Sequence, residues 1–367
     1  MSMITKKLTE ICRPKQWKTI SGKDLLPEGY PVLGANGIIG YWSEYNHEFE
    51  TITIACRGTC GAVRIAGAKS YINGNAMCLD DLSDSVLLEY LYYYLRWYDF
   101  SDIITGTSIP QITIEGLRKV MVPIPSISDQ QAIINILEKT DAIIQRRVKE
   151  LDALDDLIKA RFVEMFGKPE SDEKYPQIAI KDFTDVISGG TPDRKNNEYW
   201  ENGTIPWVKT TELQNTRINT VEECITEKGL NESSAKVVPE DTVLIAMYGQ
   251  GKTRGMTAIL GIPASTNQAC ACILPCEEVE PKYLWQYMIM SYDRLRNQAQ
   301  GGNQPNLNGN MIKNFTVLVP PKELQSQFVQ FVEQVDKSKV AVQKALMETK
   351  QLFDCMMQQF FGEKTLV

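Results

Sequence analysis

The sequence predicts an α+β chain in which two β-rich globular domains are separated by two long helices. The helices are expected to pack as an antiparallel pair within a pseudo-twofold internal repeat. Three observations predict this architecture. A stretch of 58 residues recurs 195 positions later without a gap, and each copy carries a long run of apolar residues at helical spacing. The segments before the copies are rich in Gly, Asn, Thr and short apolar runs.

The repeat aligns residues 110–167 with residues 305–362, and 11 of the 58 pairs are identical. About three or four identities are expected by chance at ordinary composition. The unbroken register therefore matters as much as the count, and it predicts one scaffold built twice. The identical pairs include Pro110/Pro305, Pro125/Pro320, Gln130/Gln325, Asp141/Asp336, Leu151/Leu346 and Phe166/Phe361.

Each copy predicts a short strand followed by a long helix. Residues 120–125 (VMVPIP) are β-prone and end in prolines, and Ser128, with a glutamine three residues later, is a candidate helix N-cap. Apolar residues then recur in steps of three and four. Helices of about 36 to 40 residues would be roughly 55–60 Å long. A globular core cannot cover such a length, so we expect the two helices to cover each other.

The seam between the helices is imperfect, because Thr140, Arg147 and Arg161 lie near core positions of one heptad assignment. An ordinary amphipathic pairing, or partial cover by another subunit, therefore stays open.

Four segments follow from the repeat: β-rich domains at 1–108 and 171–304, and repeated helical regions at 109–170 and 305–367. One helix is expected to close each domain, at 84–98 and 281–296. LTEI at 8–11 resembles FTDV at 183–186, an offset of 175 that grows to 195 at the repeat. The second domain therefore carries about 20 extra residues. The two domains would share a scaffold and differ in their loops, and binding residues usually lie in such loops.

Composition narrows the functional class. The chain has no apolar stretch of 18 residues and no signal-peptide core near its start, which predicts a cytoplasmic protein. Nine cysteines, an odd number without a secretory signal, favour reduced thiols. His47 is the only histidine, so most Ser or Cys nucleophiles would lack their usual imidazole base.

The formal net charge of −7 argues against nucleic-acid binding, but the acids are unevenly spread. Residues 51–79 contain Arg57, Arg64 and Lys69 and no acid, and residues 242–276 contain two cations and again no acid. Such windows fit either surfaces that meet an anion or buried strands with few charges. Charge alone favours neither interpretation.

Residues 246–253 (AMYGQGKT) satisfy a loose phosphate-loop pattern, which needs a helix starting at the lysine. The following RGMTAILGIP is typical of a strand, so a glycine-rich hairpin tip is favoured over a nucleotide hydrolase. Its side chains suit bases and phosphates: Gln for adenine, Arg for guanine and Lys for phosphate. The tip would present Tyr248, Gln250, Lys252 and Arg254.

Other candidate motifs favour structural roles. Structural zinc prefers two separate cysteine pairs, whereas Cys270 and Cys272 alternate as on one face of a strand, with Cys276 nearby. Buried thiols and no metal site are therefore expected. The aromatic run from Tyr90 to Tyr98 favours the buried face of a helix over a base-stacking platform. Neither paired carboxylates at a catalytic spacing nor a methyltransferase fingerprint is present, so no catalytic residue is predicted.

In its order of variable domain, long helix, variable domain and long helix, the chain resembles the specificity subunits of type I restriction-modification systems. Four phrases also resemble those subunits: YPVLGANGIIGYWSEYN at 30–46, AMYGQGKTRG at 246–255, STNQAC at 265–270 and GGNQPNL at 301–307. The resemblance covers the full length.

The resemblance implies a non-catalytic DNA-binding protein whose two domains are target recognition domains. Each would read one half of a bipartite, asymmetric site in double-stranded DNA, and half-sites read this way lie about 34–36 Å apart. The helices would set the unread gap and recruit two adenine methyltransferase subunits and the restriction subunits. S-adenosylmethionine, ATP and Mg are implied for those partners, and no cofactor is expected in this chain.

The predicted DNA contacts are polar side chains at loops or strand ends in acid-poor regions. They are Asn36, Tyr41, Arg57, Lys69 and Asn75 in the first domain, and Lys209, Tyr248, Gln250, Lys252, Arg254, Asn267 and Gln304 in the second. Two alternatives stay open. One is the recognition subunit or module of a related bifunctional restriction system. The other, more distant, is a helical adaptor with two carbohydrate- or protein-binding β domains.

Overall fold

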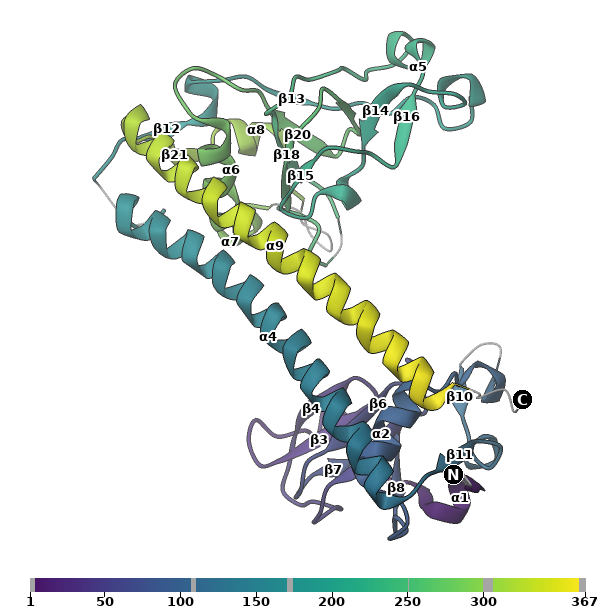
Figure 1. Cartoon of the computed structure of the whole chain (residues 1–367). Coiled ribbons are helices and arrows are strands. Elements are labelled where there is room, and N and C mark those ends of the chain that lie inside the picture. Colours follow the sequence, from purple (N-terminus) through teal and green to yellow (C-terminus); the bar gives the residue numbers. More distant parts are fainter. Residues whose placement is uncertain (1–3, 107–109, 170–173, 250, 300–305, 363–367) are drawn as a thin grey trace. The chain divides into compact units, whose positions relative to one another are not determined.

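The computed structural model describes residues 4–106, 110–169, 174–249, 251–299 and 306–362. The chain divides into two compact units: unit 1 is Met1–Lys149 with Val342–Val367, and unit 2 is Glu150–Ala341. Each unit combines one β-rich domain with a segment of both long helices, which confirms the predicted α+β class (Figure 1). The four predicted segments divide the chain according to the sequence repeat, whereas the two units divide it according to contacts in space. The units therefore do not test the predicted segment boundaries, which stay a prediction.

The repeated stretches form two helices of 40 residues, α4 (Ile127–Phe166) and α9 (Lys322–Phe361), which confirms the predicted length. The predicted N-cap of α4 is wrong. Ser126, not Ser128, caps the helix, because its hydroxyl accepts the Asp129 N–H at 3.2 Å. The helix begins directly after the Pro-Ser turn, so Ser128 already lies inside its first turn.

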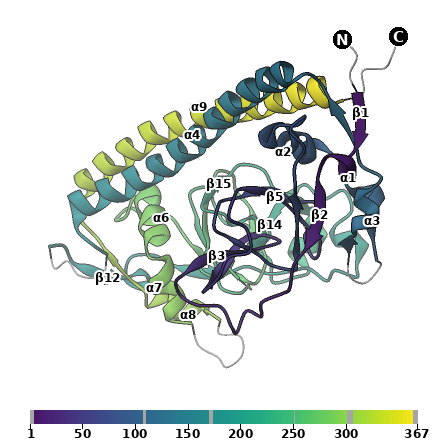
Figure 2. The same cartoon turned by 90° about the horizontal axis from the view of Figure 1, so that it is seen from below.

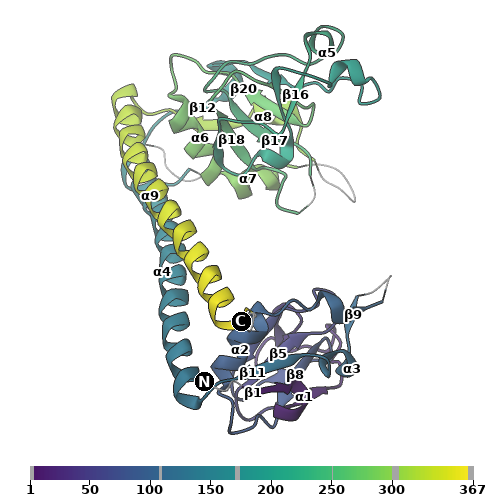
Figure 3. The same cartoon turned by 45° about the vertical axis from the view of Figure 1, so that its right-hand side comes forward.

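A two-stranded antiparallel ribbon precedes each long helix. β1 (Ile4–Lys7) pairs with β11 (Met121–Ile124), as seen in Figure 3, and β12 (Gln177–Ala179) pairs with β21 (Thr316–Leu318). A short helix α1 (Leu8–Ile11) follows β1, and the turn η2 (Ile180–Asp182) follows β12.

Helix α1 and turn η2 give a different alignment of the two domains from the one predicted from the sequence. The N–H groups of Leu8 and Ile180 donate to the carbonyls of Val120 and Phe315, which are themselves equivalent in the repeat. Leu8 therefore corresponds to Ile180, and both are fully buried. Matching LTEI to FTDV is three residues out of register, because the buried apolar side chain decides the alignment.

The first domain contains two sheets. The four-stranded sheet has the order β2 (Arg13–Gln16), β8 (Ala76–Asp80), β5 (Thr51–Ala55), β6 (Val63–Ala66). The three-stranded sheet has the order β4 (Gly37–Trp42), β3 (Tyr30–Gly34), β7 (Tyr71–Ile72). A ribbon of β9 (Ile104–Thr105) and β10 (Gln111–Ile112) leads into helix α3 (Ile114–Leu117).

The second domain repeats this plan with one more strand. Its five-stranded sheet has the order β13 (Val186–Ser188), β20 (Cys270–Ile273), β17 (Val243–Ala246), β18 (Thr257–Leu260), β15 (Thr216–Ile218). Its three-stranded sheet has the order β16 (Glu223–Ile225), β14 (Ile205–Val208), β19 (Ser265–Thr266). The added strand β15 and helix α5 (Glu227–Asn231) lie between β14 and β17, where much of the extra length falls. The turns η3 (Asn197–Tyr199) and η4 (Thr210–Glu212) and helix α8 (Gly309–Lys313) complete the domain.

Both closing helices are present but shorter than expected. α2 (Leu88–Trp97) starts after the predicted residue 84, and the second prediction is split at Ser291 into α6 (Pro281–Met290) and α7 (Tyr292–Asn297). Tyr90, Tyr93 and Tyr94 of α2 are buried, which confirms the structural interpretation of the aromatic run.

Two fully buried glutamines join the closing helices to the long helices in the same way. Gln130 accepts the Leu87 N–H at 2.8 Å and donates to the carbonyls of Ser85 and Pro125. Leu87 is the N-cap of α2, which explains why that helix begins late. Gln325 repeats the set in unit 2: it accepts the N–H of Glu280, the N-cap of α6, and donates to the carbonyls of Glu278 and Pro320.

Each unit has an apolar core that includes its closing helix and parts of both long helices. The closing helices α2 and α6 both lie beside the long helices (Figure 2). In unit 1 the first part of α4 and the last part of α9 pack on α2. In unit 2 the last part of α4 and the first part of α9 pack on α6. There the two helices run antiparallel, as shown by an Asp155–Lys339 ion pair at 2.6 Å and a Phe162–Phe328 ring contact at 5.4 Å.

All nine cysteines are free thiols. Cys270 and Cys272 are buried in one apolar cluster while Ala271 between them belongs to another, which confirms that the two cysteines share a strand face. In the described parts of the chain, none of the helices combines the length and the apolar content that crossing a bilayer requires.

Candidate nucleic-acid interface

Two hairpin loops occupy equivalent places in the two domains, between β5 and β6 and between β17 and β18. Cys56 and Met247, the first residues of these loops, donate their N–H groups to Asn75 and Ala269, which precede β8 and β20. Their carbonyls accept from Ile112 and Leu307, which are equivalent in the repeat, at 3.0 Å in both domains. Cys56 therefore corresponds to Met247, and the next residues, Arg57 and Tyr248, correspond to each other.

The acid-free windows contain both buried strands and exposed cations. Their strands β5, β17, β18 and β20 are buried along their whole length. Their cations lie mostly outside the buried strands: Arg57 and Lys252 are exposed in the two equivalent loops. Among the described residues neither of these two side chains forms an ion pair. The hairpin tips are therefore the places where these windows offer positive charge to solvent.

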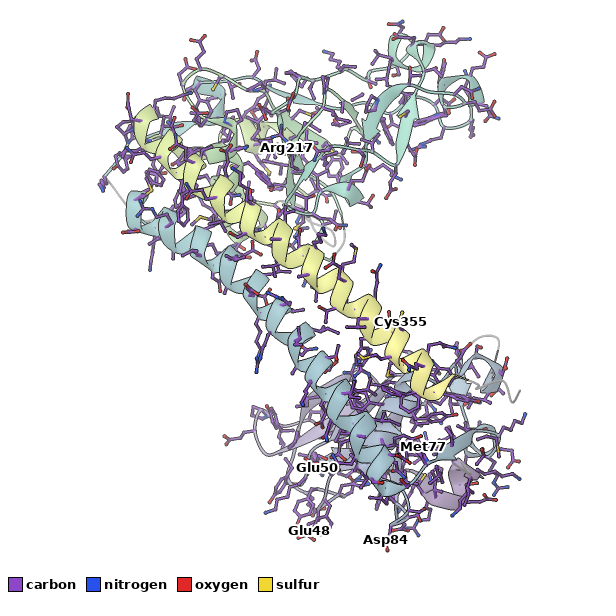
Figure 4. The ribbon with its side chains drawn as sticks, in the orientation of Figure 1. Glu48, Glu50, Met77, Asp84, Arg217 and Cys355 are labelled. Carbon is purple, nitrogen blue, oxygen red and sulfur yellow. The ribbon has the colours of Figure 1, made fainter. Side chains whose placement is uncertain are left out.

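A cleft of about 430 Å³ lies beside Arg57 in unit 1. Its polar lining comes from Gln16, Gln111, Thr113 and Arg118, and Met77, labelled in Figure 4, contributes an apolar part. Arg57 pairs with Gln111 through an isolated antiparallel bridge, which fixes the loop against β10. The cleft presents two guanidinium groups and one carboxylate, that of Glu115, which pairs with Arg118 at 2.9 Å.

The other predicted contacts of the first domain are spread over three turns and strand β4. Asn36 is exposed in the turn between β3 and β4, and Tyr41, on β4, is 37% exposed. Lys69 is exposed in the turn between β6 and β7, in a left-handed conformation with φ of 54°. Asn75 is half-buried next to the Arg57 loop, to which its carbonyl is bonded.

The loop of the second domain is longer and is held by α7. Tyr292 donates its hydroxyl to the Lys252 carbonyl at 2.7 Å, and Arg296 donates to the Arg254 carbonyl at 2.8 Å. Gly255 packs against this helix with φ of 87°, and a Cβ there would lie 3.2 Å from Arg296 Cγ. The backbone is therefore fixed from one side while Tyr248, 42% exposed, and Lys252 face solvent. Arg254 is half-buried. The predicted hairpin is confirmed, because a strand and not a helix follows the lysine.

Replacing Tyr292 by phenylalanine should loosen this loop without removing any cation. The substitution removes the hydrogen bond to the Lys252 carbonyl, worth about 1 kcal/mol, together with the bond that Arg296 donates to the same hydroxyl. If the loop binds DNA, affinity should fall by up to about tenfold while the slope of affinity against salt concentration stays constant, since no phosphate contact is removed. Fluorescence anisotropy with duplex DNA at several salt concentrations measures both quantities. Tyr199→Phe, which removes a hydroxyl bonded to Glu232 in the same domain, is the control.

The remaining predicted residues of the second domain differ in how freely their side chains could contact DNA. Lys209 contacts Glu222 at 2.6 Å and Glu223 at 2.9 Å, and these hydrogen bonds raise the pKa of its ammonium group above the usual range. DNA would have to displace two carboxylates to reach it. Asn267 is half-buried and caps its own turn by accepting the Ala269 N–H. Gln250 and Gln304 lie outside the described residues.

The structure also identifies residues that the sequence did not single out. Arg118 and Gln111 line the Arg57 cleft but belong to the repeated stretch, which was assigned to the spacer. Asn73 is the structural counterpart of Asn267, since the two donate their N–H groups to the ends of β3 and β14. A usable signal was that Arg118 and Gln111 align with polar Lys313 and Asn306. Arg217, labelled in Figure 4, is instead neutralised by Glu240 and Asp241.

The protein family described as "Type I restriction modification DNA specificity domain" matches residues 3–153 and 173–349 of this chain. The two matched regions contain both β-rich domains and most of both long helices.

Individual relatives and solved structures agree with this match. The chain is 26% identical to the type I restriction enzyme EcoR124I/EcoR124II specificity subunit of Escherichia coli, over 69% of this chain and 64% of the relative. It is 23% identical to the type I restriction enzyme MjaIX specificity subunit of Methanocaldococcus jannaschii, over 85% and 77%. The chain thus spans just under two thirds of the first relative's length.

The fold is similar to that of the type I restriction-modification S subunit of M. genitalium, with a TM-score of 0.60, 18% identity and coverage of 100% and 97%. A structure described as the structural basis of complex assembly and conformational transition of the type I R-M system matches with a TM-score of 0.56, 17% identity and coverage of 98% and 97%. With a family match over both repeated halves and the same fold, this chain belongs to the type I restriction-modification DNA specificity subunits.

Proposed function

We propose that this chain reads a bipartite, asymmetric site in double-stranded DNA, with one half-site for each β-rich domain, and catalyses no reaction itself. One observation carries the proposal. The two domains share a frame down to the hydrogen bonds of their hairpin loops, yet they present Arg57 in one and Tyr248 in the equivalent place of the other. An asymmetric site needs equivalent positions with unlike side chains, because base edges are read by side-chain chemistry.

The long helices support a role in recruitment. Among the large apolar side chains of α4 and α9 that are 43–65% exposed, five lie seven or fourteen residues from the next of the five on the same helix, which places them on one face of each helix. They are Ile136, Ile143 and Leu157 on α4, and Val340 and Met347 on α9. We infer that two adenine methyltransferase subunits, which would use S-adenosylmethionine, cover such faces. Restriction subunits using ATP and Mg would join them.

The helices would also set the length of the unread gap, since a helix of 40 residues is about 60 Å long. The nine free thiols are compatible with a reducing cytoplasm, where we place this function.

Sequencing the methylome with and without this gene tests the function. We expect the loss of one bipartite adenine-methylation motif when the gene is deleted. An unchanged methylome despite a functional methyltransferase partner would contradict the proposal.

Substitutions in the two loops test the interface. Arg57→Ala is expected to relax specificity in one half of the motif only, at a cost of about 1–3 kcal/mol if it reads a base. Lys252→Ala should weaken binding across sequences and reduce the salt slope by about 1 if it contacts phosphate. Lys149→Ala, which removes an exposed charge from α4, is the control. If both loop variants leave affinity, salt slope and methylated sequence unchanged, the interface lies elsewhere.

A further inference from the structure

We propose that His47, Cys78 and Asp80 of unit 1 form a binding site for one divalent transition-metal ion, best suited to zinc. One ligand atom from each residue lies within 4.8 Å of the other two. The site is separate from the proposed DNA interface and does not depend on the proposed function.

The fold brings the three residues together from distant parts of the sequence. Cys78 and Asp80 alternate on β8, so their side chains emerge from the same face of the strand. His47 lies in the segment after β4 and is fixed by backbone hydrogen bonds in both directions with Ser70. Glu48 and Met77, which neighbour His47 and Cys78 in the chain, are labelled in Figure 4. His47 is 8% exposed and Cys78 is fully buried.

Asn46 determines which nitrogen of His47 carries a proton. Its amide orientation is set by Ile72, because Nδ2 donates to the Ile72 carbonyl at 3.1 Å and Oδ1 accepts the Ile72 N–H at 2.8 Å. The same Oδ1 lies 2.7 Å from His47 Nδ1, so Nδ1 must be the protonated donor. The lone pair of the neutral ring is then on Nε2.

Nε2 of His47 lies 2.9 Å from Asp80 Oδ1. A lone pair cannot face a carboxylate oxygen at that distance without a positive charge between them. Either a proton lies between the two atoms, or a metal ion takes the place of that proton. A hydrogen bond from the other ring nitrogen is the arrangement that metal-binding histidines usually have.

Trp17 supplies an independent observation. Its indole Nε1 is buried and has no hydrogen-bond acceptor among the described residues. Burial and the Asp80 charge raise the pKa of Cys78 to about 12, whereas the neighbouring Trp17 N–H lowers it. In its thiol form Cys78 donates to the Lys15 carbonyl at 3.1 Å. A metal-bound thiolate would be a better acceptor for the Trp17 N–H than the thiol is.

Charge balance favours metal uptake in this buried place. Without metal, the His47–Asp80 pair with the proton between its two atoms carries no net charge, and it lies beside a neutral thiol. Binding of M²⁺ displaces the Nε2 proton and the thiol proton, and both leave to solvent. The neutral ring, thiolate, carboxylate and ion again sum to zero. No net charge is therefore added to the interior.

The donor set selects the metal. One imidazole nitrogen, one thiolate and one carboxylate suit zinc and disfavour Mg²⁺ and Ca²⁺, which prefer oxygen. Zinc bonds of about 2.0–2.3 Å put tetrahedral ligand atoms roughly 3.3–3.8 Å apart, so small side-chain rotations suffice. A water molecule or the second Asp80 oxygen would complete the tetrahedron. The ion would tie the segment after β4 to β8, and with it the two sheets of the first domain.

Cobalt titration of the reduced full-length chain tests the site. The protein must be purified without a polyhistidine tag, since His47 is its only histidine. We expect tetrahedral Co²⁺ bands and a thiolate charge-transfer band that saturate at one metal per chain and disappear when Zn²⁺ is added. Zn²⁺ should raise the thermal midpoint, and EDTA should reverse the rise. Affinity should weaken as the pH is lowered, because binding releases protons from the ligands.

Cys78→Ala should abolish the charge-transfer band. Cys272→Ala is the matched control, because Cys272 occupies the equivalent position of β20. Its partner there is Leu244, as that of Cys78 is Thr53, and it is buried without a neighbouring histidine or carboxylate in the described structure. If circular dichroism shows Cys78→Ala to be unfolded, Asp80→Asn replaces it and should lower the affinity at least about tenfold.

Three results would overturn the proposal. The first is absence of stoichiometric binding, with ¹⁵N-histidine spectra showing both ring nitrogens of the single histidine protonated near neutral pH. That outcome identifies a buried imidazolium–carboxylate pair. The second is an unchanged cobalt spectrum in folded Cys78→Ala, and the third is an equal effect of Cys272→Ala. None of these results bears on DNA recognition.

Discussion

Replacing Phe166 by alanine is expected to destabilise unit 2 by about 3–5 kcal/mol, and Phe361→Ala to destabilise unit 1 by a similar amount. Phe166 is fully buried, and its ring lies 5.2 Å from that of Tyr283 and 5.6 Å from that of Phe328. Phe361 is 5% exposed, with the rings of Tyr90 and Tyr94 both at 5.6 Å.

Phe166 and Phe361 are equivalent positions of the repeat, yet they stabilise different units. Phe166 lies in the core of unit 2, and Phe361 lies in the core of unit 1. α4 follows the first domain in sequence, but its last turn packs on α6 of unit 2. α9 follows the second domain, and its last turn packs on α2 of unit 1. Removing either ring opens a cavity in one core only. Destabilisation should therefore be local to that unit.

Hydrogen exchange followed by mass spectrometry measures this locality. Phe361→Ala should accelerate exchange in α2 and the last turns of α9, and Phe166→Ala in α6 and the last turns of α4. Leu157→Ala and Leu352→Ala are matched controls, because they are an identical pair of the repeat and are 46% and 56% exposed. Their effects should stay within about 0.5 kcal/mol. Equal acceleration in both units by one phenylalanine variant would contradict the local packing described here.

The long helices were predictable because their signal is local. Steps of three and four along the sequence determined their length, and the ungapped repeat predicted that both would have the same one. Details that depend on the neighbouring chain were not predictable. Ser126 rather than Ser128 caps α4, because α4 begins directly after the turn that contains Ser126. Helix α2 begins later than predicted, because the N–H of its N-cap residue Leu87 donates to Gln130. The identity of Gln130 and Gln325 was visible in the sequence, but its reason was not.

In the candidate site, even more of the detail depends on residues that are distant in the sequence. The hairpin tip at Lys252 followed from glycines and a strand pattern, and the structure confirms it. The ion pairs of Lys209 could not be foreseen, since Glu222 and Glu223 approach it only because β16 pairs with β14. His47 and Cys78 likewise come together only in the folded chain, without any motif spacing in the sequence.

Replacing Gln325 by leucine is expected to destabilise unit 2 by about 2–5 kcal/mol. The substitution keeps the volume of the side chain but leaves the Glu280 N–H and the carbonyls of Glu278 and Pro320 without their partner. Each buried polar group left unsatisfied costs about 1–3 kcal/mol. Gln130→Leu should act likewise on unit 1, where the same three bonds join α2 to the start of α4.

Urea unfolding gives the free energy, and exchange of the Glu280 amide reports the lost bond directly: its protection should fall in Gln325→Leu and persist in Gln130→Leu. The exposed Gln330→Leu and Gln131→Leu are the controls on the same helices. Gln325→Glu distinguishes the hydrogen bond that the side chain accepts from the two that it donates. It can still accept the Glu280 N–H, but an ionised carboxylate would face two carbonyls. Its pKa should therefore be raised in the folded chain, and its deficit relative to wild type should shrink as the pH falls through that pKa. A deficit that grows on acidification would show that the two carbonyls do not depend on the Gln325 amide.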